Sequence, residues 1–192
     1  MMAKTNEILD LMNKNWIYEA IITTTDPGGS PRASPIGIST PDSERIILEI
    51  YKTSKTSENI TLDKKFIINF VMYVEIFWNA TIHENLEFDN FGHLKDSDAW
   101  LEMEVEDVED AGEKIKIYSK ISDYEIKKPG VALINRAKYL AMESIIKFTK
   151  PDSSKAEDEI NENLRVIKKV APGSKYEKIV KEILNKIKTS PL

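Results

Sequence analysis

Residues 51–60 of the chain are Tyr51-Lys52-Thr53-Ser54-Lys55-Thr56-Ser57-Glu58-Asn59-Ile60, a dense cluster of hydroxyls, lysines and an amide. The cluster lies between two apolar segments, residues 46–50 and 66–71, that both have the composition of buried strands. We therefore predict a strand that ends in hydroxyl side chains and leads into a short helix. Backbone N–H groups at a helix start, the helix dipole and nearby lysines together favour a phosphate at such a turn.

The same cluster also fits a simpler interpretation, because Ser and Thr in front of a helix commonly serve as N-caps. No Ser or Thr in it is followed three residues later by Glu or Gln, so a capping box is absent. It also lacks glycine, which excludes a P-loop and a dinucleotide-binding fingerprint. The candidate phosphate ligands are Lys52, Ser54, Thr56 and Asn59, and a capped helix with a solvated face is the alternative.

Short strands and tight turns surround the cluster. β-Branched residues are frequent in the first strand, and the turn-forming residues 26–31 lead into the second. The predicted strands are residues 16–25, 32–40, 46–50 and 65–72, one from Trp100 to the turn at Asp110, and 114–126. Six short antiparallel strands favour a small barrel over a doubly wound sheet.

Helices are expected before, within and after this sheet. A short helix is predicted at 5–13 with Thr5 as its cap, and another at 74–82, followed by a polar loop at 84–97. Helical spacing predicts a further helix over 131–149, ended by Pro151-Asp152-Ser153, a second around Ile160 to Ile167, and a third capped by Ser174.

These elements predict an α+β protein, mainly β, whose core is a six-stranded antiparallel barrel with a C-terminal helical extension. We expect the barrel in residues 1–128 and the extension in residues 129–192, packed on the barrel.

Composition excludes several function classes. The formal net charge is −5, and no basic stretch pairs with exposed aromatics, so we expect no nucleic-acid partner. The absence of cysteine excludes disulfides, thiolate catalysis and iron–sulfur sites. No segment approaches the roughly 20 apolar residues of a membrane span and no signal core opens the chain, so we expect no membrane association and a cytoplasmic location.

Two groups of titratable residues are candidates for functional sites. His83 and His93 are too few and too far apart for a metal motif, so we expect no metal. Glu102, Glu104 and Glu106 alternate along one strand and indicate a solvated face rather than a pair of catalytic carboxylates. Catalytic residues therefore remain unassigned.

Several segments, taken in order, resemble an uncharacterised, largely archaeal family of FMN-binding split-barrel proteins, related to flavin reductase-like and pyridoxamine-phosphate-oxidase-like proteins. No single motif carries the resemblance. It rests on the order and spacing of residues 18–24, 31–37, 54–60, 66–70, 94–102, Asn135-Arg136-Ala137 and Glu143.

The resemblance implies a homodimer that binds FMN at the subunit interface. The flavin phosphate is expected at the turn before the helix, and the ring along Ser34, Pro35, Ile36 and Gly37, where Pro35 and Gly37 leave the backbone approachable. An edge strand with a bulge is the alternative for that segment. The resemblance also suggests that Asn79, beside Trp78 and Ala80, meets the flavin from the partner subunit.

Two functions follow from this resemblance. The first is an FMN-dependent oxidoreductase of the flavin reductase-like type, acting on an unknown small molecule, in which the flavin carries the redox chemistry. The second is a flavin- or phosphate-ligand-binding module without turnover, such as a carrier, sensor or scaffold. The sequence does not separate the two.

Overall fold

The structure is a computed structural model that describes residues 7–149 and 153–189. The predicted cap Thr5 and the predicted helix-ending residues Pro151 and Asp152 lie outside these residues. The chain forms two compact units. The barrel unit contains residues 19–134 and the segment before Asn15, and the helical unit combines residues 15–18 with the helices that follow residue 134.

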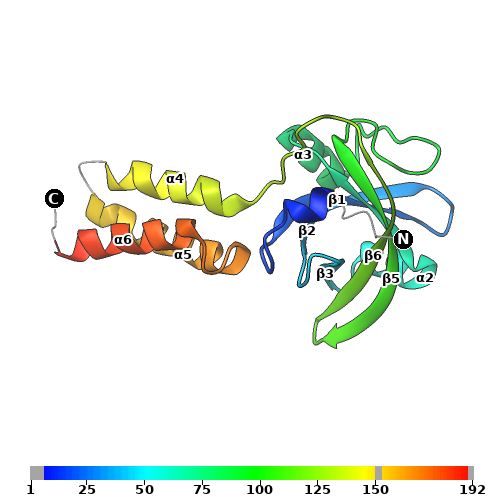
Figure 1. The fold of residues 1–192 in the computed structure, drawn as a ribbon. Helices are drawn as coiled ribbons and strands as arrows, with labels where there is room; N and C mark the ends of the chain where they lie inside the picture. Colours follow the sequence, from blue (N-terminus) through cyan, green and yellow to red (C-terminus); the bar gives the residue numbers. More distant parts are fainter. Residues whose placement is uncertain (1–6, 150–152, 190–192) are drawn as a thin grey trace. The chain divides into compact units, whose positions relative to one another are not determined.

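Six strands form a closed antiparallel barrel (Figure 1). The strands are β1 (Tyr18–Thr25), β2 (Pro31–Ser39), β3 (Arg45–Tyr51), β4 (Lys65–Phe70), β5 (Ala99–Ala111) and β6 (Lys114–Ile126). Their order around the barrel is β1-β2-β3-β6-β5-β4. The predicted fold class, an α+β protein built on a six-stranded antiparallel barrel with C-terminal helices, is confirmed.

The barrel interior follows the period-two pattern of its strands. In β3, Ile46, Leu48 and Ile50 are buried, while the residues between them are half-buried or exposed. The same alternation buries Ile115 and Ile117 in β6. One-sided burial of this kind fixes the register of each strand, because a slip of one residue would turn the apolar set outward.

Two helices accompany the strands of this unit. Helix α2 (Lys55–Asp63) connects β3 to β4, and α3 (Val74–Ile82) packs against β2. Beneath α3 lies a second apolar cluster formed by Ile21, Ala33, Val71, Ile76, Ala80 and Leu94. The N-terminal helix α1 (Glu7–Asp10) ends three residues before the predicted end at 13, since Leu11 and Met12 leave it in a turn.

A long loop, residues 84–98, follows α3 and lies against β1 and β4. The fully buried amide of Asn69 holds it there: its oxygen accepts from the Leu94 N–H at 2.9 Å, and its nitrogen donates to the Thr23 hydroxyl at 2.9 Å. The predicted loop at 84–97 is confirmed, and an internal polar residue, not predicted from the sequence, fixes its position.

The strand β5 departs from the strict alternation predicted for it. Register irregularities occur between Glu102 and Met103 and between Val105 and Asp107. Such bulges change which way the following side chains point. Glu102, Glu104 and Glu106 also have different surroundings: Glu102 binds the buried His93, while Glu104 forms an exposed ion pair with Lys65.

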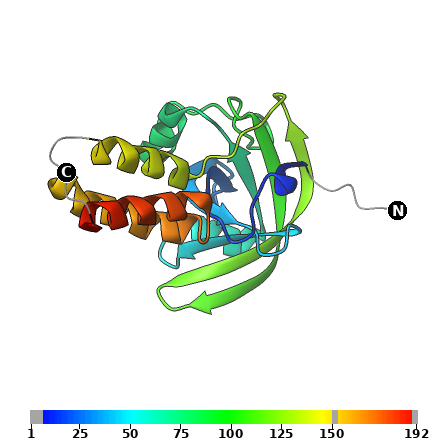
Figure 2. The ribbon, with the colours of Figure 1, turned by 60° about the vertical axis from the view of Figure 1, so that its left-hand side comes forward.

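The helical unit contains α4 (Arg136–Phe148), α5 (Ser153–Val170) and α6 (Lys175–Thr189), which lie side by side in both ribbon views (Figures 1 and 2). All three helices share one apolar core, which contains Ala137, Ala141, Ile160, Leu164, Ile167, Val170, Ala171, Val180, Ile183, Leu184 and Ile187. The predicted cap of α6 is confirmed, because the Ser174 hydroxyl accepts from the Glu177 N–H at 3.2 Å.

Asn135 explains two sequence-predicted boundaries that were wrong, the start of α4 and the start of β1. Its side chain caps α4 by accepting from the Ala137 N–H at 2.9 Å, so the helix begins after residue 135 and not at 131. The Asn135 amide also donates to the carbonyls of Ile17 and Val170. Trp16 and Ile17 therefore pack in the helical unit, and β1 begins at Tyr18 rather than Trp16.

Within the described residues, no helix combines the length and apolar character that crossing a membrane requires.

Candidate functional site

The start of α2 is built by Ser54, the residue between β3 and the helix. Ser54 has an extended backbone, its hydroxyl accepts from the Ser57 N–H at 3.1 Å, and it donates to the Tyr51 carbonyl at 2.9 Å. Ser54 is thus an N-cap, as the simpler interpretation proposed. Helix geometry gives the Lys55 and Thr56 N–H groups no acceptor inside α2, so they remain available to an anion.

Thr56 joins the two segments that the sequence indicated separately. It is buried in the first turn of α2, and its hydroxyl donates to the Ser34 hydroxyl on β2 at 3.1 Å. The hydroxyl cluster and the Ser34–Gly37 segment are 22 positions apart at this contact, yet they touch. A group bound at the start of α2 therefore lies beside β2.

Asn59 faces the barrel one turn further along α2. It is buried, and its amide donates to the Thr24 hydroxyl on β1 at 3.0 Å. Together with Thr56 and Ser57 it gives α2 a polar buried face. The structure thus connects Asn59 to β1, while Ser54, Thr56 and Ser34 gather at the helix start.

The two lysines of the cluster are engaged by carboxylates at the surface. Lys52 bonds Asp110 at 2.7 Å, and Lys55 bonds Glu58 at 2.8 Å. The hydrogen bond from Lys52, with a second one from the Gly112 N–H, holds the pKa of Asp110 below its usual value. Exposed pairs of this kind contribute about 0–1 kcal/mol, so a bound dianion can compete for either lysine.

The segment Ser34–Gly37 precedes the ladder between β2 and β3, which joins Ile38 to Leu48 and Ser39 to Ile47. Pro35 is exposed, and Ser34, Ile36 and Gly37 are half-buried. A partly exposed strand segment with two apolar side chains, Pro35 and Ile36, therefore lies directly beside the Thr56–Ser34 contact.

Asn79 lies on a different element from the rest of the predicted set. It belongs to the last turn of α3, where its carbonyl accepts from the N–H groups of His83 and Glu84. Its side-chain amide lies 3.5 Å from the Asn85 carbonyl. The structure does not bring Asn79 to the start of α2 within this chain.

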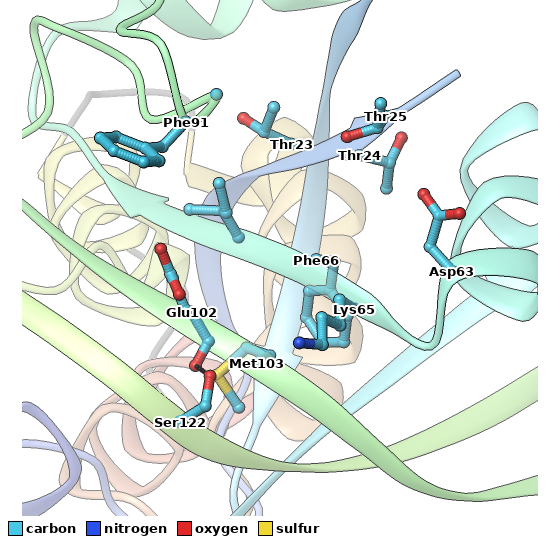
Figure 3. A pocket seen from close by; sticks show the side chains of 12 residues that line it. Thr23, Thr24, Thr25, Asp63, Lys65, Phe66, Phe91, Glu102, Met103 and Ser122 are labelled. Atoms are coloured by element: carbon cyan, nitrogen blue, oxygen red, sulfur yellow. Dashed lines mark hydrogen bonds between the residues drawn. The ribbon is translucent and has the colours of Figure 1, made fainter. Parts of the chain in front are cut away.

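A cavity of about 180 Å³ opens near the other end of α2 (Figure 3). Its side chains come from β1, β4, β5, β6, the end of α2 and the long loop, and they include Thr23, Thr24, Thr25, Asp63, Lys65, Phe91, Glu102 and Ser122. Phe91 is 79% exposed at its rim. This cavity was not predicted from the sequence, although three consecutive threonines at the end of a strand, Thr23–Thr25, were a visible signal.

His93 lies at the back of the same loop and is nearly fully buried. Its ring stacks on Trp100 with centroids 3.9 Å apart, its Nδ1 lies 2.8 Å from Asp89, and its Nε2 lies 3.0 Å from Glu102. Burial alone would raise the pKa of Asp89, but the hydrogen bonds from His93 and from the backbone of Phe91 and His93 hold it below its usual value. This cluster anchors the loop that forms one wall of the cavity.

The chain matches the N-terminal domain of a family described as protein of unknown function (DUF447). The match spans residues 18–128, which is more than half of the 192-residue chain. It covers all six strands of the barrel and both predicted halves of the site.

Solved structures share the fold. An FMN-bound protein from Methanosarcina mazei, of the same family, is 20% identical with a TM-score of 0.55, and the match covers 93% of this chain and 99% of that one. The flavin reductase HpaC, solved with NADP+, is 17% identical with a TM-score of 0.54, over 67% of this chain and 95% of that one. An NADH:FAD oxidoreductase from Streptomyces globisporus is 9% identical with a TM-score of 0.52, and the match covers 62% of this chain and 81% of that one.

Proposed function

Because the chain belongs to the DUF447 family, we propose that it is a flavoprotein that binds FMN at the start of α2 and works as an oxidoreductase on a small molecule. The observation that carries the proposal is the Thr56–Ser34 contact, which joins an anion-binding helix start to an apolar strand surface. A relative of the same family is an FMN-bound protein, and two structures of similar fold are flavin-handling oxidoreductases.

The residues at this place fit the phosphate end of FMN. Phosphate oxygens need several hydrogen-bond donors, and this place offers them. They are the backbone N–H groups of Lys55 and Thr56, the hydroxyls of Ser54, Thr56 and Ser34, and the ammonium group of Lys52. The helix dipole adds partial positive charge at the same point. The Ser54 and Thr56 hydroxyls already bond neutral partners and Lys52 an exposed carboxylate, so a phosphate would replace modest contacts there.

The segment Pro35–Gly37 suits the ring end. An isoalloxazine needs a flat apolar wall and backbone groups at its pyrimidine edge, and Pro35 and Ile36 supply the wall while Gly37 leaves the backbone open. FMN supplies hydride and electron transfer when bound, so the protein's part is to hold and orient it.

A homodimer follows from the surface of α3 as part of the same proposal. An apolar patch there contains Met72, Tyr73, Val74, Trp78 and Ile82, and Trp78 is 62% exposed. Clustered apolar side chains of this kind mark a surface that another protein covers. A second copy of the chain, seated on this patch, would bring its own site close to Asn79. Light scattering on the flavin-loaded protein measures its oligomeric state. A monomer at micromolar concentration would contradict the proposed homodimer.

The first experiment on function is a visible spectrum of the freshly purified protein, followed by heat release and identification of any chromophore. We expect FMN, bleached when NADH or NADPH is added. Bound flavin that neither nicotinamide reduces would leave flavin binding intact and favour the module without turnover. A cytoplasmic location stays a prediction.

The second experiment tests the phosphate position through Thr56→Ala. The variant loses a hydroxyl beside the phosphate, and one hydrogen bond to a charged group contributes roughly 1.5–3 kcal/mol, so FMN should bind about 10- to 100-fold more weakly. Riboflavin, which lacks the phosphate, should be affected far less. Thr61→Ala is the matched control, because Thr61 is an exposed threonine of the same helix. Equal weakening of FMN and riboflavin would move the phosphate elsewhere.

A further inference from the structure

Arg32 occupies an unusual position on β2. It is half-buried, and among the described residues its side-chain partner is the imidazole of His83, whose Nε2 lies 2.9 Å from Nη2 of the arginine. No carboxylate within the described part of the chain forms an ion pair with it. Arginine is normally paired when it is withdrawn from water, since a guanidinium carries five donors and a permanent charge.

The contact between Arg32 and His83 fixes the roles of the imidazole nitrogens. A guanidinium can only donate, so Nε2 of His83 accepts and Nδ1 of the neutral ring carries the proton. Both side chains thus keep unused donors: four N–H bonds on Arg32 and one on His83. An oxyanion beside the guanidinium would accept from the remaining N–H bonds of Arg32.

These donors line a hollow of about 200 Å³ on the barrel unit. Its walls are Asp26, Pro31, Arg32, Ala33, His83, Asn85, Leu86 and Phe88. His83 and Asn85 both have left-handed backbones, with φ of 59° and 52°, which turn the chain sharply after α3 and hold both side chains at the rim. The Asp26 carboxylate is the one acidic wall, and its Oδ1 is already occupied by the N–H groups of Gly28 and Ser30.

We propose that this hollow is a second oxyanion site, which holds the phosphate or carboxylate group of a small ligand other than the flavin. Arg32 supplies a planar fork that matches a phosphate or carboxylate in two-point contact, and His83 and Asn85 supply directional donors beside it. Arg32 and Ser34 lie on the same face of β2, about 7 Å apart along the strand. The hollow is therefore a neighbour of the flavin site, with a donor set of its own.

A purely structural role makes a different prediction. Arg32 and His83 could simply offset the negative end of the α3 dipole. The last-turn carbonyl of Asn79 already accepts from the backbone of His83 and Glu84, and the guanidinium contacts the imidazole rather than a helix carbonyl. A structural arginine would change stability on substitution and leave anion binding alone.

The test is an amide chemical-shift titration of the full-length, flavin-free protein, first with sodium phosphate and then with sodium acetate, at constant ionic strength set by sodium chloride. We expect saturable shifts at the amides of Ala33, His83 and Asn85. The two anions distinguish the two ligand classes. Saturation at a lower phosphate concentration identifies a phosphorylated ligand, and saturation at a lower acetate concentration identifies a carboxylated one.

Arg32→Gln should weaken this binding about tenfold or more. His83→Asn, in which asparagine tolerates the left-handed backbone but no longer reaches the arginine, should weaken it less. Arg165→Gln is the charge-matched control, because Arg165 is exposed on α5 and pairs with Glu162. Shifts that fail to saturate, or that survive unchanged in Arg32→Gln, overturn the proposal.

A flavin titration separates this site from the first. Arg32→Gln should leave FMN affinity within about twofold of the unsubstituted protein. If it weakens FMN as strongly as Thr56→Ala does, the hollow is part of the flavin phosphate site and the second site does not exist. Loss of FMN binding in Thr56→Ala alone leaves the hollow untouched, so the two proposals fail independently.

Discussion

The two units of this protein bury polar side chains for different purposes. In the helical unit, the buried polar residues mainly bind backbone groups at helix ends: Ser174 caps α6, Glu177 accepts from the Gly173 N–H, and Asn135 caps α4 and also donates to the Ile17 and Val170 carbonyls. In the barrel unit they connect separate elements, as in Thr56 to Ser34, Asn59 to Thr24 and Asn69 to the long loop. The three-helix core is held mainly by apolar packing, whereas a barrel that positions irregular backbone depends more on directional bonds between side chains.

The largest expected effect comes from breaking one such connection. Asn69→Leu keeps the volume but leaves the Leu94 N–H, the Thr23 hydroxyl and the Ile21 carbonyl without their partner. Each unsatisfied buried group costs about 1–3 kcal/mol, so we expect a loss of about 3–5 kcal/mol in the free energy of unfolding. We also expect weaker flavin binding. Urea unfolding followed by circular dichroism and flavin fluorescence measures both.

Ser174→Ala is the counterpart in the helical unit. Removal of a helix cap costs about 1 kcal/mol, and flavin affinity should not change. If the two substitutions have equal effects on stability, the contrast between the units is not real. If Ser174→Ala releases flavin, the helices contribute to the site.

A smaller effect is expected in acid, at the loop anchor of the barrel unit. The pKa of Asp89 is held below its ordinary value of about 4, so its ionised form stabilises the folded state above that value. The stabilisation is lost as the pH falls through the lowered pKa of the folded state. Asp89→Asn should therefore be less stable than the unsubstituted protein at pH 7, and the difference should shrink below about pH 4.

Glu177 gives the matched comparison in the helical unit. The hydrogen bond from Lys181, and a second from the Gly173 N–H, hold its pKa low in the same way. Glu177→Gln should also be less stable than the unsubstituted protein at pH 7, with a difference that shrinks in acid, when the unfolding of the helical unit is followed. The side chains of the cavity should stay undisturbed. Acid unfolding of each variant, followed by the fluorescence of Trp100 beside His93, decides whether the Asp89 effect is local. A difference that stays constant down to pH 2 would contradict it.

The barrel strands could be predicted because the sequence patterns that specify them are local. Period-two apolar patterns and turn residues such as those at 26–31 and 110–113 fix strands without knowledge of the rest of the chain. Trp16 and Ile17 look like strand residues for the same reason. They belong to the helical unit because Asn135, far along the chain, binds the Ile17 carbonyl.

The candidate site was predictable only in part. A hydroxyl cluster before a helix is visible in the sequence, and its neighbour Ser34 came from a family resemblance. The Arg32–His83 hollow and the His93 anchor join residues whose pairing depends on how a long loop and α3 fold over β2. Two histidines judged too distant for a metal site proved to have separate structural settings, one at a helix end and one against Trp100.

The smallest expected effect concerns Lys52, which belongs to the barrel unit but lies at its surface. Asp110 holds this lysine two residues before the α2 cap, and the pair is exposed. Asp110→Asn keeps an oxygen for the Gly112 N–H but removes the charge that competes with a phosphate for Lys52. Since an exposed ion pair contributes at most about 1 kcal/mol, FMN should bind about two- to fivefold more tightly at low salt.

Two controls, salt concentration and the use of riboflavin, test whether the tighter FMN binding of Asp110→Asn comes from the release of Lys52. Charge competition at the surface is screened, so the gain should disappear at about 0.5 M salt, and riboflavin should show none at any salt. Glu109→Gln, a neighbouring carboxylate that bonds Tyr118, is the charge-matched control. A gain shared by Glu109→Gln, or by riboflavin, would mean that net charge rather than Lys52 is responsible. Unlike the buried connections of Asn69 or Thr56, this contact would then be a surface pair with no part in the site.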